Sequence, residues 1–120
     1  MSHQVVWLDI PVINLDRAIK FYSAVLGQTV HKDESHGTAV GVLPHGDGDV
    51  GGCLFHDPAR PPSREGALAY LNADGRLEAA EAAISSNGGQ VLESKHAIGP
   101  YGFRTVFLDS EGNRLALHSK

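Results

Sequence analysis

His118 and Asp9, on two predicted strands far apart in the chain, are the candidates for acid–base chemistry. An imidazole changes charge near neutral pH, and a carboxylate beside it would hold the ring in the orientation that a general base needs. The alternative interpretation is a partly exposed histidine close to the end of the last strand. The pair therefore predicts a catalytic site only if the fold brings these two strands together.

Cys53 is the single cysteine and the only candidate for a thiol nucleophile. A reactive cysteine needs a neighbouring cation or helix terminus that lowers the pKa of the thiol, and the local sequence provides neither. The alternative, a small buried apolar residue, is therefore favoured. One cysteine also excludes an internal disulfide and fits a reducing compartment, so we expect a cytoplasmic protein.

Aromatic side chains form the third group of candidates. Trp7 and Tyr70 would stack on a flat ligand if they shared a cavity, but they would equally serve as core residues. Tyr101 and Phe103 lie in a glycine-rich stretch, 96–104, that is either a loop over the ligand or an ordinary long turn. Whether either aromatic pair faces a ligand depends on how the strands and loops that carry these residues are placed.

The chain contains two copies of one pattern, residues 5–55 and 67–118, offset by about 61 residues. Each copy opens with a short apolar strand and continues with a helix that ends at glycine. The first helix starts after Asn14 and stops at Gly27; the second runs from 75 to 87 and is capped by Asp74 or by the turn before it. The extended segments are predicted at 5–12, 29–32, 38–43, 50–55, 67–72, 91–94, 103–109 and 114–119.

Three prolines mark residues 57–66 as the linker between the copies, because proline removes a backbone donor and interrupts sheet pairing. We therefore expect one domain over 1–120, with module one at about 3–56 and module two at about 67–119. The predicted fold class is α+β: two βαβββ modules whose mixed sheets pair around a cleft.

Composition narrows the function classes. The net charge is -4, with 42% hydrophobic and 20% charged residues, as in ordinary globular proteins. No cluster of lysine and arginine is present, so a nucleic-acid partner is not expected. No apolar run approaches the ~20 residues that span a membrane, and the first residues run into a strand without a signal peptide.

Two segments carry a resemblance to a known family. Residues 9–27, DIPVINLDRAIKFYSAVLG, resemble the opening of the vicinal oxygen chelate superfamily, and residues 107–117, FLDSEGNRLAL, resemble its closing hairpin. This superfamily includes glyoxalase I, bleomycin and fosfomycin resistance proteins and extradiol dioxygenases. The chain looks most like its group of predicted enzymes related to lactoylglutathione lyase, whose reactions are mostly unassigned. The resemblance implies the paired-module fold and a homodimer.

The resemblance also implies where a catalytic metal would be bound. Members that use a metal take one histidine or glutamate from each of four strands, and these positions fall at Trp7, at Cys53 or Leu54, at Leu68 and at Ala116. Trp, Leu and Ala provide no donor for a divalent ion. We therefore expect no metal and no other cofactor.

The same positions indicate which side chains share the cleft, because alternate residues of a strand point the same way. Asp9 follows Trp7, Tyr70 and Asn72 follow Leu68, and Arg114 and His118 lie on either side of Ala116. We expect the carboxylate of Asp9 to be partnered by Arg114, by His118 or by backbone N–H groups. The expected ligand-binding residues are Trp7, Tyr70, Asn72, Cys53, Tyr101, Phe103 and Arg114, with His118 and Asp9 as the catalytic candidates.

Three functions are compatible with this sequence. The first is a metal-free protein that binds a small organic molecule, as the bleomycin-resistance relatives do. The second is a lyase or isomerase in which His118 and Asp9 act as acid and base. The third is a metal-dependent lyase or dioxygenase with a displaced site drawn from Cys53, His56, His96 or His118. The sequence does not identify a ligand.

Overall fold

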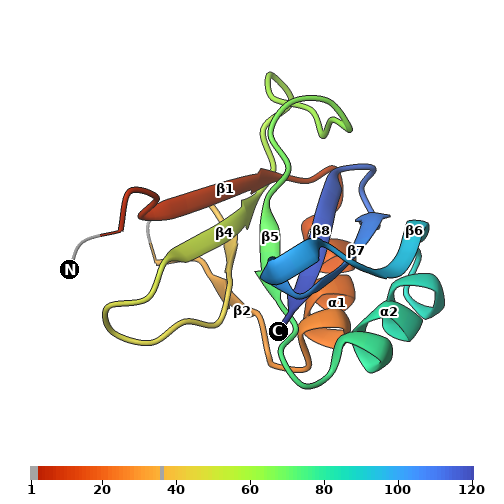
Figure 1. Cartoon of the computed structure of the whole chain (residues 1–120). Coiled ribbons are helices and arrows are strands. Elements are labelled where there is room, and N and C mark those ends of the chain that lie inside the picture. Colours follow the sequence, from red (N-terminus) through yellow and green to blue (C-terminus); the bar gives the residue numbers. More distant parts are fainter. Residues whose placement is uncertain (1–2, 36) are drawn as a thin grey trace.

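The computed structural model describes residues 3–35 and 37–120 and confirms the predicted α+β class (Figure 1). The first half consists of β1 (Trp7–Pro11), α1 (Leu15–Leu26), β2 (His31–Asp33), β3 (Val40–Val42) and β4 (Gly51–Phe55). The second half consists of β5 (Tyr70–Asn72), α2 (Leu77–Ser86), β6 (Gln90–Ala97), a 3-10 helix (Gly99–Tyr101), β7 (Phe103–Leu108) and β8 (Arg114–Ser119). No helix among the described residues is long and apolar enough to cross a membrane.

The two halves have the same topology. The first sheet, sheet A, has the strand order β1-β4-β3-β2, and the second, sheet B, has the order β5-β8-β7-β6. In each sheet the first strand pairs in parallel with the last, and the other pairs are antiparallel. Asp9 pairs with Cys53 in sheet A, and Tyr70 pairs with Ala116 in sheet B. The duplication seen in the sequence is therefore a duplication of strand order.

Helix α1 forms as its sequence predicts. The Asn14 side chain accepts a hydrogen bond from the Arg17 backbone N–H at 3.0 Å, and Gly27 ends the helix with φ 68°. Helix α2 differs in its start, because its N-cap is Arg76 and makes no side-chain cap. Asp74 does not cap this helix and instead accepts a hydrogen bond from the Lys120 backbone N–H.

Strand lengths depart from prediction in the second half. β5 is shorter than the predicted 67–72, while β6 extends through His96 and Ala97, which were expected in a loop. The pairing of β6 with β7 shifts register between Val91 and Glu93 and again before His96. These irregularities let a strand continue where the hydrophobic alternation is lost, which is why the sequence pattern ended it too early.

The core lies between the helices and one face of each sheet. Helices α1 and α2 lie side by side against the strands (Figure 1). Ile10 and Leu54 bring sheet A into this core, and Phe107 and Leu117 bring in sheet B. Because side chains alternate along a strand, the neighbouring positions point away from the helices. We call these sides the open faces: Trp7, Asp9 and Cys53 on sheet A, and Tyr70, Arg104, Ala116 and His118 on sheet B.

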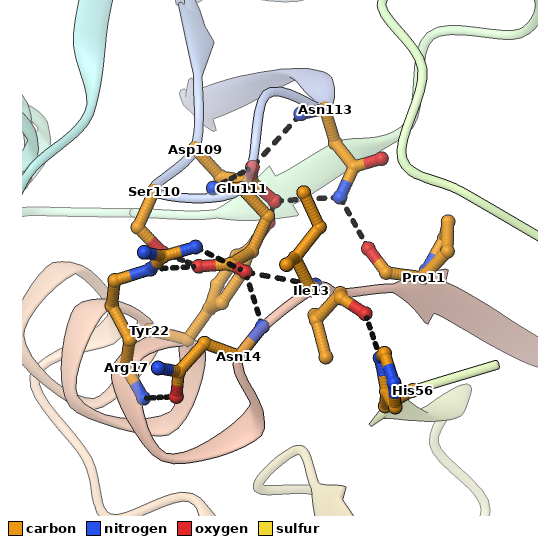
Figure 2. A network of polar contacts seen from close by, with 11 residues as sticks. Pro11, Ile13, Asn14, Arg17, Tyr22, His56, Asp109, Ser110, Glu111 and Asn113 are labelled. Carbon is orange, nitrogen blue, oxygen red and sulfur yellow. Dashed lines mark hydrogen bonds and ion pairs between the residues drawn. The ribbon is translucent and has the colours of Figure 1, made fainter. Parts of the chain in front are cut away.

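A buried carboxylate joins the two halves. Glu111, in the β7–β8 turn, accepts hydrogen bonds from the backbone N–H groups of Ile13 and Asn14, both at 2.8 Å, and from Arg17 at 2.7 Å (Figure 2). Burial alone would raise the pKa of this carboxyl, but the bonds from Arg17, Asn14, Ser110 and Ile13 lower it to about 2. The negative charge lies at the first turn of α1, where the helix dipole favours it.

A second set of contacts surrounds this carboxylate. The Tyr22 hydroxyl donates to Asp109 at 2.6 Å, and the Asn113 amide donates to the Pro11 carbonyl at 2.7 Å (Figure 2). Burial, followed by the charge and hydrogen bond of Asp109, raises the pKa of Tyr22 well above its ordinary value. At the other end of α1, the Arg76 guanidinium donates to the Val25 carbonyl at 2.7 Å.

Candidate functional site

The open face of sheet A carries three connected side chains. The Trp7 indole N–H donates to Asp9 Oδ1 at 2.8 Å, and the Cys53 thiol donates to the same oxygen at 3.3 Å. These bonds correct the expectation that Arg114, His118 or backbone groups would partner Asp9. Trp7 remains 48% exposed, so its ring is oriented by the carboxylate while still open to a ligand.

Cys53 is a protonated thiol in this setting. Burial raises its pKa to about 11, and the Asp9 carboxylate adds to the shift as a hydrogen-bond acceptor and as a nearby negative charge. A thiol with this pKa is almost entirely neutral at pH 7, so it is a poor nucleophile and a poor metal ligand. The small apolar role is therefore the one that the geometry favours.

The open face of sheet B centres on Arg104. Its Nη1 donates to the Tyr70 hydroxyl at 2.6 Å, and its Nε donates to His96 Nε2 at 3.0 Å. His96 Nδ1 lies 2.9 Å from the Ser94 carbonyl, which can only accept. The ring therefore carries its proton on Nδ1 and is neutral, which leaves Nε2 free to accept from Arg104.

His118 neighbours this group but does not meet Asp9. Its Nε2 donates to the Tyr101 carbonyl at 2.6 Å, and its ring centroid lies 6.3 Å from that of Tyr70. Since Asp9 is bonded to Trp7 and Cys53 on the other sheet, the predicted orienting contact between Asp9 and His118 is not made within the described chain. A carbonyl oxygen holds this imidazole instead.

The other predicted residues are dispersed. Asn72 accepts a hydrogen bond from the Asp74 backbone N–H, and Arg114 donates to the Gly66 carbonyl beside the linker. The Phe103 ring lies 4.9 Å from Lys95 Nζ, and its place in β7 puts it on the same face as Phe107, opposite to Arg104. Tyr101 is 75% exposed in the 3-10 helix. The structure thus does not gather these side chains into one cavity.

A groove of about 1360 Å³ lies between the two halves. Apolar side chains line it, including Leu8 of β1, Val42 of β3 and Leu71 of β5, together with Leu43, His31 and His45. Of the predicted site residues only Tyr70 and Asn72 contribute to it. The expected cleft exists between the sheets, but most of the expected chemistry lies on the open faces outside it.

The remaining histidines do not form a displaced metal site in the described part of the chain. His56 Nδ1 lies 3.0 Å from the Val12 carbonyl, and His96 accepts from Arg104. Within residues 3–35 and 37–120, no group of three or more histidine, cysteine, aspartate or glutamate side chains is placed to hold a metal ion.

Arg104 and His96 were missed as site residues by the sequence analysis. His96 was assigned to a loop because the glycines and proline after it indicate a turn, and Arg104, although inside the predicted strand 103–109, was not placed on the face that carries His118. In the structure Arg104 pairs with His118 on one side and with His96 on the other, so the three lie in one row across β8, β7 and β6. Extending the strand alternation from His118 across the hairpin would have placed Arg104 beside it.

The chain is similar in sequence and structure to one known superfamily. A model of the Glyoxalase/Bleomycin resistance protein/Dioxygenase superfamily matches residues 4–117. A glyoxalase/bleomycin resistance protein from Albidiferax ferrireducens T118 superposes with a TM-score of 0.80 at 18% identity, covering 98% of this chain and 99% of that one.

Two further structures share the fold. TnmS3, an antibiotic binding protein from Streptomyces sp. CB03234, has a TM-score of 0.71 and 24% identity over 99% of this chain and 96% of its own. A glyoxalase I mutant from Zea mays has a TM-score of 0.69 and 22% identity, covering 95% of this chain and 46% of that one. A search of curated proteins finds no match. At these identities the structures share a fold and do not assign a ligand.

Proposed function

Because the chain belongs to the Glyoxalase/Bleomycin resistance protein/Dioxygenase superfamily, we propose that it binds a small organic molecule on the open faces of its sheets, without a metal ion. The observation that carries this proposal is the pair of half-exposed aromatic rings, Trp7 and Tyr70, at 48% and 45% exposure. Each ring is held by a hydrogen bond at its polar end, to Asp9 and to Arg104 respectively. Oriented, solvent-facing aromatic surface of this kind suits a ligand better than it suits water.

Several features support binding rather than turnover. Among the described residues the contact of His118 is with the Tyr101 carbonyl rather than with a carboxylate that would orient a general base, and the Cys53 thiol is protonated. At the positions where the resemblance implies metal ligands, Trp7, Leu68 and Ala116 offer no atom that binds a divalent ion. The similarity of the fold to that of an antibiotic binding protein is compatible with this function.

We further propose that the protein is a homodimer. The aromatic rings of the two open faces, Trp7 and Tyr70, are about half exposed, and a second copy would cover them. The face of sheet A carries the Asp9 carboxylate, and the face of sheet B carries the Arg104 guanidinium, so the faces of two copies would be complementary in charge. A ligand enclosed between them would contact Trp7 of one copy and Tyr70 of the other.

We also propose that residues 1–120 form one domain that acts in the cytoplasm. The lone thiol of Cys53 is free in the structure, which suits a reducing compartment. The linker at 57–66 joins module one to module two and has no role in the binding that we propose.

A fluorescence titration tests the function directly, because Trp7 is the only tryptophan. Untagged protein is titrated with a panel of aromatic and antibiotic compounds while indole emission and thermal stability are followed. We expect saturable quenching and a rise in melting temperature for at least one class. Trp7→Ala should weaken that binding at least ~tenfold, as measured calorimetrically, because the stacking surface is lost.

The control is Ile13→Ala, which removes an exposed apolar side chain outside the open faces and should leave affinity unchanged. Absence of any saturable shift across the panel would refute the binding function. Mass spectrometry of the metal content tests whether binding is metal-free, and stoichiometric metal would refute that proposal. Sedimentation at micromolar concentration tests the homodimer, and a monomer at all concentrations would refute it.

A further inference from the structure

We propose that Tyr70 and Arg104 form a pair of hydrogen-bond donors that binds an anionic oxygen, and that the small molecule is therefore an aromatic acid that presents a carboxylate. This inference rests on the proposed function and specifies the chemical class of its ligand. Both side chains are held by hydrogen bonds within the protein, and both have N–H or O–H groups for which the described residues provide no acceptor.

The Tyr70 hydroxyl has one donor free. It accepts from Arg104 Nη1 at 2.6 Å, and guanidinium nitrogens can only donate, so the phenolic proton is not used in that bond. The structure records no acceptor for this proton among the described residues. The hydroxyl sits on an open face at a residue that is 45% exposed, so a ligand oxygen can reach it.

Arg104 is fixed in place but only partly satisfied. Of its five N–H groups, one on Nε donates to His96 and one on Nη1 donates to Tyr70. Glu93 is the nearby carboxylate, at 3.8 Å from Nη2, which is an ion pair longer than a hydrogen bond. Its side chain is 54% exposed while that of Arg104 is 26% exposed, so the guanidinium is the better shielded of the two charges.

The geometry of the cluster determines where a ligand would approach. His96 and Glu93 occupy the β6 side of Arg104, and Tyr70 occupies the β5 side. A carboxylate on the Tyr70 side would accept from the hydroxyl and from the remaining Nη1 proton together. Donor pairs of this kind favour a charged acceptor, because charge-assisted hydrogen bonds are about twice as strong as neutral ones.

The aromatic part of the ligand follows from the surrounding rings. The His118 ring stands at 61° to that of Tyr70, with centroids 6.3 Å apart, so the two form an angled wall beside the donors. The Tyr101 carbonyl holds His118 in this orientation. A flat conjugated body packed on Tyr70 would bring its acid group next to Arg104.

The test compares two probes of the same shape, 2-naphthoate and its neutral amide, 2-naphthamide. Calorimetry and amide chemical shifts are measured on the full chain. We expect naphthoate to bind at least ~tenfold more tightly than naphthamide, in proportion to one charged hydrogen bond. Tyr70→Phe keeps the ring and removes the hydroxyl, and Arg104→Gln removes the charge; each should reduce the preference to below ~threefold.

Arg60→Gln is the matched control. It makes the same change of charge in the linker, at an arginine whose side chain is 75% exposed, and should retain the full preference. Circular dichroism checks that each variant is folded; if Arg104→Gln is not, Tyr70→Phe alone decides. Equal affinity for the two probes, or a preference that survives in Tyr70→Phe, overturns the inference.

The two proposals fail in different ways. Naphthamide binding as well as naphthoate would leave the binding function standing and remove only the selectivity for anions. If neither probe binds at millimolar concentration while a neutral compound of the wider panel does, the inference is again overturned and the function is not. Only the absence of saturable binding for every compound of the panel and for both probes would refute both proposals.

Discussion

Replacing Glu111 with glutamine should destabilise the protein by an amount that depends on pH. The Glu111 side chain has no exposed surface, and its carboxylate accepts hydrogen bonds from two backbone N–H groups, from Arg17 and from Ser110. Glutamine has the same shape but presents an NH₂ group to donors on one side. It also leaves the Arg17 charge without its partner.

The magnitude follows from the proton affinity of the carboxyl. Its pKa falls from 4.5 to about 2 on folding. Each tenfold change in proton affinity corresponds to ~1.36 kcal/mol, so the charged carboxylate stabilises the fold by ~3 kcal/mol at pH 7. Because the pKa is lower in the folded state, this contribution is complete above pH ~4.5, falls to ~1.4 kcal/mol at pH 3, and is nearly lost as the pH passes through 2.

Urea unfolding followed by circular dichroism at 222 nm, at several pH values, measures the difference between wild type and Glu111→Gln. Glu78→Gln is the control, because the Glu78 carboxylate is 84% exposed in an ion pair with Lys95. This substitution should change the free energy of unfolding by less than ~0.5 kcal/mol. A difference below ~1 kcal/mol at pH 7, or one that does not shrink between pH 5 and pH 3, would refute the reasoning.

Three other predictions concern buried groups. Cys53, with a pKa of about 11, should react with iodoacetamide at pH 7.5 at least ~100-fold more slowly than free cysteine. Asp9→Asn should accelerate this reaction, because it removes a charge that raises the pKa of the thiol. Equal rates in wild type and Asp9→Asn would contradict the role given to Asp9. Tyr22→Phe should cost ~1–3 kcal/mol in urea unfolding, and in an alkaline absorbance titration Tyr22 should ionise only on unfolding, since its pKa lies well above 10.0. Gly89→Ala should lower the melting temperature strongly, because an added Cβ would lie 2.6 Å from a backbone oxygen, whereas Gly46→Ala, 3.2 Å from a flexible carboxylate, should be nearly neutral; similar melting temperatures would argue against the clash.

The sequence predicted the elements with strong local signals. Helix α1 has an asparagine cap, an apolar stripe and a terminal glycine, and its bounds came out as expected. The β8 strand, Arg114–Ser119, was predicted to the residue because a turn and an alternating pattern bound it. The end of β6 was missed, since the register shifts at Val91 and Glu93 are properties of the pairing with β7 and have no local pattern.

The candidate site was predicted only in part, for a related reason. Strand alternation placed Trp7 and Asp9 on one face, where they are bonded to each other, while Cys53 or Leu54 was suggested by the resemblance and Cys53 is the one that reaches Asp9. It could not show that Asp9 and His118 would be held on separate sheets by separate partners, because the placement of one sheet against the other depends on how both helices pack. Arg104 lay inside the predicted strand 103–109 and was missed because the alternation was not extended across the hairpin from His118.

The contacts at the two ends of α1 make the halves of the duplication unequal. Glu111 binds the first turn of this helix and Arg76 binds its last carbonyls, so both ends are completed by side chains of the second half. In the corresponding turn of the first half, the carboxylate of Asp49 accepts a local hydrogen bond from the Gly46 N–H. Two copies of the first half joined in tandem would lose the contacts of Glu111 and Arg76 at the ends of both helices, and two copies of the second would leave each Glu111 without Arg17. The repeat is symmetric in its backbone, but its halves are no longer interchangeable.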